Sequence, residues 1–201
     1  MLRSNLMRRK AFPGWFPGQV IVVLALAVLF VSASEARSDP GLRILVWKSK
    51  RQIWVTRGDE MIRRYPVSLG KEPKGAKEAR GDGRTPVGVY YVYEKRPTSK
   101  YHRFLALNYP AIQDAERALR AGLITADTWA DIWIANTRRQ KPPWNTPLGG
   151  FVGIHGTGGQ GRQARLRRLL DWTEGCIALS DQDVEELYEI TPVGTPVEIY
   201  E

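Results

Sequence analysis

The chain has 201 residues and a mass of 22.8 kDa, which is enough for one domain and a short additional segment. Hydrophobic residues make up 43% and charged residues 25%, so the composition excludes wholesale disorder. One cysteine excludes an intramolecular disulfide, and with only two histidines it excludes a four-ligand structural zinc site. The net charge of +9 favours an acidic partner, such as nucleic acid, anionic lipid or an acidic polymer.

The first 36 residues have the order of a secretory signal peptide. Four basic residues at positions 3–10 precede an unbroken apolar run at 20–31, and small residues allow cleavage after Ala36. Twelve apolar residues are short for a bilayer span of about 20, and an uncleaved anchor is the alternative. We therefore expect export to the periplasm or cell envelope, with membrane contact only through this segment. Without it, residues 37–201 carry a net charge of +6 and form one predicted domain.

The rest of the chain predicts a mostly β domain (α+β) with two or three inserted helices. Apolar, β-branched and aromatic segments predict strands at 42–48, 51–57, 61–69, 89–93, 104–109, 151–155 and 196–200. Apolar residues at helical spacing predict helices at about 112–119 and 125–136, and a third that begins after Ser180. A long loop at 70–84 contains four glycines, and loops of this length in compact domains are often functional.

The single cysteine, Cys176, is the first candidate for chemistry, because Gly175 before it allows the backbone to approach a substrate closely. A reactive thiol needs a base, and the chain offers only His155 and His102. His155 ends an apolar strand and is followed by a glycine-rich loop, whereas His102 lies among polar residues. From composition alone, a buried inert thiol and a structural histidine at the sheet rim remain open alternatives.

The spacing of these residues resembles a known family. Ile154-His155-Gly156, a spacer that ends at Trp172, and Thr173-Glu174-Gly175-Cys176 together resemble the signature of the L,D-transpeptidase catalytic domain of the YkuD type. The segments Thr85-Pro86-Val87-Gly88 and Leu148-Gly149-Gly150 also resemble that family. The resemblance covers about 42–201, and it implies a YkuD-type β-sandwich-like catalytic domain.

The resemblance implies an enzyme of bacterial cell-wall peptidoglycan that uses neither a metal nor an organic cofactor. Cys176 would attack the carbonyl of an L-centre in a stem peptide and expel a D-residue, and His155 would act as general base and acid. An amine would resolve the acyl-enzyme in cross-linking or protein attachment, whereas water would resolve it in trimming. Backbone N–H groups of Gly175 and Cys176 would stabilise the oxyanion. We also expect pairing with His155 to give Cys176 a low pKa.

Two positions depart from the family pattern. Many members have histidine where this chain has Glu174, and many have arginine or asparagine where it has Ala178. This variant resembles the branch of murein L,D-transpeptidases, some relatives of which instead hydrolyse the link between peptidoglycan and a Braun-type lipoprotein. The fold and the nucleophile therefore carry over, whereas the acyl acceptor does not.

The spacer between histidine and cysteine is rich in arginine and has no acidic residue before Asp171. We expect it to form a lid whose guanidinium groups bind stem-peptide carboxylates, with a solvated charged face as the alternative. The predicted substrate-binding residues are Gly156, Thr173, Arg162, Arg165, Arg167 and Arg168.

The expected partners are peptidoglycan stem peptides and, in the hydrolase alternative, an outer-membrane lipoprotein. Export argues against nucleic acid. A non-catalytic cell-wall binding module and a cysteine protease acting on proteins are the other function classes. The intact cysteine and histidine argue against the first, and the sequence gives no separate sign of the second.

Overall fold

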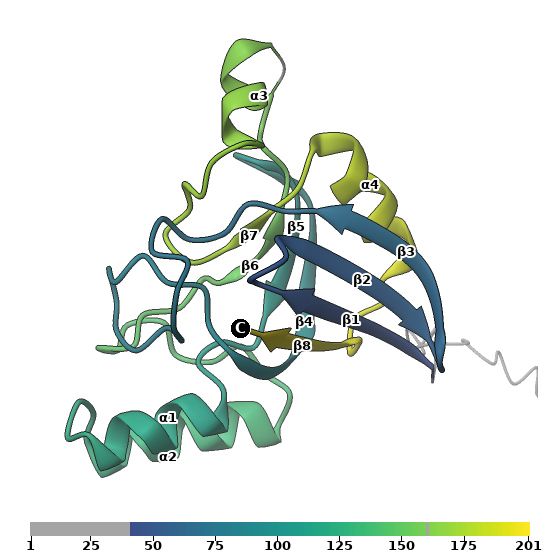
Figure 1. Cartoon of the computed structure of the whole chain (residues 1–201). Helices are drawn as coiled ribbons and strands as arrows, with labels where there is room; N and C mark the ends of the chain where they lie inside the picture. The colour runs from purple at the N-terminus through teal and green to yellow at the C-terminus, as the bar shows by residue number, and fades with distance from the viewer. Residues whose placement is uncertain (1–40, 160) are drawn as a thin grey trace, which may run out of the picture. The chain divides into compact units, whose positions relative to one another are not determined.

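The computed structural model describes residues 41–159 and 161–201, which form an eight-stranded mixed sheet with four helices (Figure 1). The strands are β1 (Leu42–Trp47), β2 (Gln52–Arg57), β3 (Glu60–Pro66), β4 (Gly88–Ser99), β5 (His102–Leu107), β6 (Gly153–His155), β7 (Ile177–Ala178) and β8 (Pro196–Tyr200). The helices are α1 (Ile112–Arg120), α2 (Ala126–Thr137), α3 (Arg162–Arg167) and α4 (Asp181–Ile190). The signal peptide or anchor predicted over 1–36 lies outside the described residues.

The strands follow the order β3-β2-β1-β8-β4-β5-β6-β7, and β4 connects the two halves. The first residues of β4 pair with β8, and its later residues pair with β5. The β1–β8 and β6–β7 pairs are parallel and the other neighbouring pairs are antiparallel. Alternate residues of β1 and β8 are buried in the main core, as period-2 patterning requires.

Helix α4 packs against β5 and β6, the half of the sheet that carries the predicted histidine. Its first turn is capped by Ser180, whose hydroxyl accepts a hydrogen bond from the Asp183 N–H at 3.0 Å. Val184 and Leu187 face the core from this helix. Helices α1 and α2 form a separate hairpin with its own small apolar cluster, and α3 stands away from the sheet at the top of Figure 1.

The mostly β fold predicted from the sequence is confirmed, with three main differences. The short strand β7, which pairs with β6, lies where the sequence pattern predicts no strand. A fourth helix, α3, lies in the arginine-rich spacer, where the pattern predicts only a lid. Strand β4 continues to Ser99, past the end predicted at 93, because its polar residues still pair with β5. Among the described residues, no helix combines the length and apolarity that a bilayer span requires.

Candidate active site

A cavity of about 450 Å³ opens beside β6 and contains both the chain's cysteine and its buried histidine in its walls. The segments that line it are distant in sequence: the β4–β5 turn, the residues before β6, and the segment that leads into β7. The side chains that shape it are Tyr101, Phe104, Phe151, His155, Trp172 and Cys176. The structure therefore brings together the two residues that the sequence predicts as nucleophile and base.

His155 is the last residue of β6 and is only 3% exposed. Its Nδ1 lies 2.6 Å from the carbonyl oxygen of Gly156, and since a carbonyl can only accept, Nδ1 carries the hydrogen. The Nε2 atom is then left with its lone pair and can accept a proton. Burial lowers the pKa of His155 to about 4, so the imidazole is neutral near pH 7.

Three aromatic rings pack around the imidazole. Tyr101 stacks on His155 with ring centroids 4.8 Å apart, and Phe104, its cross-strand partner, is stacked at 6.1 Å. Trp172 presents an edge to the imidazole at 5.8 Å. These rings exclude water from the histidine, which is the physical cause of its low pKa.

The Cys176 thiol donates a hydrogen bond to the Phe151 carbonyl at 3.4 Å. Phe151 adopts a positive φ of 60°, a conformation that is uncommon for a non-glycine residue and that costs backbone strain. Burial raises the pKa of Cys176 to about 11. The low thiol pKa expected from the sequence is therefore wrong for the resting site, because desolvation disfavours the thiolate and the neutral imidazole supplies no positive charge.

The turn before the cysteine is built around Gly175 and Thr173. Gly175 has a φ of +133°, and a Cβ there would lie 2.6 Å from the Arg84 carbonyl oxygen, so the position requires glycine. The Thr173 hydroxyl donates to the Cys176 carbonyl at 2.7 Å and accepts from the Gly175 N–H at 3.1 Å. This second bond engages one of the two N–H groups that the sequence assigns to the oxyanion. Thr173 also lines the cavity, as its predicted binding role requires.

The loop after His155 is fixed by Asp181, at the start of α4. Its carboxylate accepts hydrogen bonds from the N–H groups of Gly158 and Gly159, each at 2.9 Å. Gly156 donates its N–H to the Tyr101 carbonyl at 2.8 Å, and a side chain there would overlap Asp181. The carbonyl of Gly156 thus orients the His155 ring. Gly156 does not line the cavity, and the substrate contact predicted for it stays a prediction.

The four spacer arginines do not form one cluster. Arg167 donates to the Thr157 carbonyl at 2.6 Å and lies 4.9 Å over the Trp172 ring, beside the cavity. Arg165 and Arg168 line a different groove, of about 370 Å³, together with Ser68. Arg162 is exposed at the start of α3, so only Arg167 lies next to the candidate site.

Sequence reasoning missed the aromatic walls and one buried cation, Lys77, which lies in the loop between β3 and β4. The loop's length and its glycines were the available signal for the lysine. His102, the other histidine, is exposed at the start of β5, and its Nε2 lies 2.5 Å from a carboxylate oxygen of Glu185. It does not line the cavity.

No group of three or more His, Cys, Asp or Glu side chains is arranged as metal ligands within 41–159 and 161–201. The site's polar groups are instead suited to proton transfer and acyl chemistry.

Comparisons with known proteins agree with the resemblance inferred from the motifs. The family model of the L,D-transpeptidase catalytic domain (YkuD) matches residues 41–199. No curated protein sequence matches the chain. The structure of Bd1075 from Bdellovibrio bacteriovorus has a TM-score of 0.50 at 19% identity, over 80% of this chain and 48% of that one.

The helical cell shape determining protein Pgp2 of Campylobacter jejuni gives a TM-score of 0.51 at 19% identity, over 80% of this chain and 47% of that one. The chain thus spans about half the length of these solved relatives. At this level of identity the likeness shows a shared fold.

Proposed function

We propose that this chain, which belongs to the family of YkuD-type L,D-transpeptidase catalytic domains, transfers acyl groups between peptidoglycan stem peptides through a thioester on Cys176. The observation that carries the proposal is the single cavity that contains Cys176 together with a buried histidine of fixed tautomer. A non-catalytic binding module has no need of this pair.

The reaction divides into two steps of the same kind. Nε2 of His155 takes the thiol proton while the sulfur attacks the carbonyl carbon of the donor's L-centre. The tetrahedral intermediate collapses, the C–N bond breaks, and the departing amine of the D-residue takes the proton from His155. An acceptor amine then attacks the thioester and gives a proton to His155; the C–S bond breaks, and His155 returns the proton to the departing sulfur to regenerate the thiol.

The oxyanion of each intermediate needs preorganised donors. Because the Gly175 N–H is engaged by Thr173, we assign the Cys176 N–H as the backbone donor. The bond between the Thr173 hydroxyl and the Cys176 carbonyl fixes the direction of this peptide segment.

A second hollow favours transfer over hydrolysis. It measures about 260 Å³ and shares Gly150, Phe151 and Glu174 with the cavity that contains the thiol. Two adjoining spaces give room for a donor and an acceptor peptide on either side of Phe151. Hydrolysis that trims a D-residue or releases a Braun-type lipoprotein is the alternative, with water in place of the amine. We place the enzyme in the cell envelope, to which the predicted segment 1–36 would direct it.

Incubation of the protein with purified muropeptides, followed by mass spectrometry of products and of intact protein, tests the proposal. We expect a thioester adduct on the wild type, with the mass of the donor minus its terminal D-residue, and none on Cys176→Ala. Dimers or amine-exchanged products indicate transfer, whereas trimmed monomers alone indicate the hydrolase. Product formation by Cys176→Ala at the wild-type rate would refute the proposal.

A further inference from the structure

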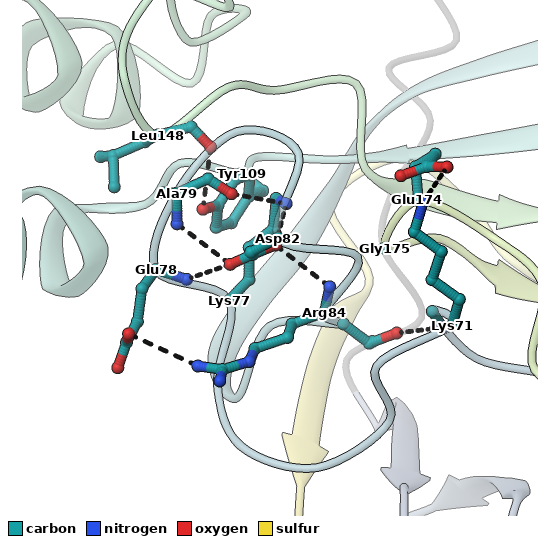
Figure 2. A network of polar contacts seen from close by, with 12 residues as sticks. Lys71, Lys77, Glu78, Ala79, Asp82, Arg84, Tyr109, Leu148, Glu174 and Gly175 are labelled. Carbon is teal, nitrogen blue, oxygen red and sulfur yellow. Dashed lines mark hydrogen bonds and ion pairs between the residues drawn. The ribbon is translucent and has the colours of Figure 1, made fainter.

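The loop between β3 and β4 contains an ion pair, Lys77–Asp82, that takes no part in the reaction steps proposed above. Lys77 is 3% exposed, and its Nζ donates to Asp82 at 2.7 Å and to the Ala79 carbonyl at 3.0 Å (Figure 2). Asp82 also accepts hydrogen bonds from the N–H groups of Glu78, Ala79 and Arg84. Burying a lysine is costly, and an ion pair rarely repays that cost in stability.

This loop lies directly against the turn at 173–176 that precedes and includes Cys176, here called the nucleophile turn. The Arg84 carbonyl and the Lys77 side chain are the groups that a Cβ at Gly175 would meet, at 2.6 Å and 3.6 Å. The same loop is joined to the turn by a hydrogen bond from the Lys71 N–H to the Thr173 carbonyl and by the Lys71–Glu174 ion pair at 2.8 Å. Figure 2 shows the Asp82 network and the Gly175 segment within one close view.

Asp82 is held as a carboxylate. Burial raises its pKa, but the hydrogen bonds from Lys77 and from backbone N–H groups outweigh burial and bring the pKa below its ordinary value. The Lys77 ammonium is therefore held by Asp82, while the Cδ of the same side chain lies 3.6 Å from the place that a Cβ at Gly175 would take. Burial also raises the pKa of the Cys176 thiol, and against it act the Gly153 N–H and the positive charge of Lys77.

We propose that Lys77 is a positioning residue whose buried ammonium, anchored by Asp82, stabilises the negative charge that develops on the Cys176 sulfur. The proposal rests on Cys176 being the nucleophile, but not on the identity of the substrate. The other charged or titratable groups that share a cavity wall with Cys176 are Lys100, His155 and Glu174. Those that share one with Lys77 are Glu78, Arg80, Asp114, Arg117 and Glu174.

The test measures alkylation of Cys176 by iodoacetamide, which needs no peptidoglycan substrate. We expect Lys77→Met to slow alkylation at pH 9 by about three- to tenfold, because a nearby buried charge is lost. Lys77→Arg should recover most of the rate. Lys74→Met removes an exposed lysine from the same loop and should leave the rate unchanged.

The direction of the change in alkylation rate distinguishes loss of the Lys77 charge from disruption of the loop. A disrupted loop would expose the thiol and move its pKa toward the ordinary value of about 8.5, which speeds alkylation. Removing the negative charge of Asp82 with Asp82→Asn should also speed alkylation, and in the Lys77→Met background the same change should recover only part of the lost rate. If Lys77→Met alone does not fold, the Lys77→Met/Asp82→Asn pair, which leaves no orphaned charge, must still react more slowly than wild type.

Alkylation of Lys77→Met, or of the pair, at or above the wild-type rate would overturn the inference. That outcome would leave the proposed transpeptidase intact, since muropeptide turnover by the wild type tests it separately. Conversely, a wild type that forms no acyl-enzyme refutes the proposed function, while the alkylation series still tests the influence of Lys77 on the thiol.

Discussion

The resting Cys176 thiol should react with iodoacetamide more slowly than an ordinary cysteine. Burial raises its pKa to about 11, against about 8.5 for an unperturbed thiol. At pH 7 this difference reduces the thiolate fraction about 300-fold. A thiolate of higher pKa is intrinsically more nucleophilic, by about 13-fold for a Brønsted coefficient of about 0.45. The net expectation is alkylation about 25-fold slower than for the unfolded chain.

The assay follows the mass of the intact protein during alkylation between pH 6 and pH 11, in buffer and in denaturant. Because the chain has one cysteine, every thiol adduct reports on this site. The folded protein should show a rate that still rises above pH 9, whereas the denatured protein should level off near its ordinary pKa. Faster alkylation of the folded protein at pH 7 would refute the neutral pair and indicate a thiolate–imidazolium pair.

Replacement of the base provides the matched control. His155→Asn should change the alkylation rate by less than about threefold, because a neutral imidazole contributes no charge to the thiolate. The same substitution should lower muropeptide turnover by about 10²- to 10⁴-fold, the usual contribution of a general base. If His155→Asn lowered the alkylation rate and muropeptide turnover by the same factor, the histidine would be acting on the thiol as a positively charged imidazolium before the substrate binds.

Three further predictions concern the histidine, the arginines and the nucleophile turn. Because burial lowers the His155 pKa to about 4, the unfolded chain binds more protons than the folded one at mildly acid pH. The free energy of unfolding should fall by up to about 3 kcal/mol from pH 7 to pH 4, and urea titrations of His155→Asn should show a shallower fall. Arg167→Gln should lower kcat/KM by about three- to thirtyfold and Arg168→Gln by less than about twofold, and the reverse ranking would contradict the geometry. Thr173→Val should lower the free energy of unfolding by about 1–3 kcal/mol, measured in urea, with Thr173→Ser close to wild type.

Most of the strands and the family were predictable because their signals are local. Alternating apolar residues mark β1 and β2, and the spacing from His155 to Cys176 carries the family resemblance. The short helix α3 was not predictable in the same way, because Arg162–Arg167 contains only one leucine and no apolar stripe. The position of α3 in the fold determines which arginine lies beside the cavity. The sequence alone therefore could not show that Arg167, and not the other three arginines of the predicted lid, lies there.

The electrostatics of the site were not predictable because they arise from contacts between distant segments. The rings of Tyr101, Phe104 and Trp172 desolvate the histidine, yet they come from the β4–β5 turn, from β5 and from the end of the spacer. Lys77 likewise lies in a loop that the sequence predicts to be exposed, because it contains several charged residues and glycines. Only the approach of this loop to the Gly175 turn makes the lysine relevant to the thiol.

In the proposed mechanism, these electrostatics determine when the thiolate of Cys176 forms. With pKa values of about 11 for Cys176 and about 4 for His155, moving the proton from sulfur to Nε2 costs on the order of 9 kcal/mol before the attraction between the new charges is counted. The ion pair is therefore scarce in the empty site, and the proton must move as the sulfur–carbon bond forms. A fixed positive charge beside the turn lowers the energy of that step without contacting the substrate. Changes at Lys77 should consequently appear in kcat more than in KM, since the interaction is stronger in the transition state than in the bound ground state.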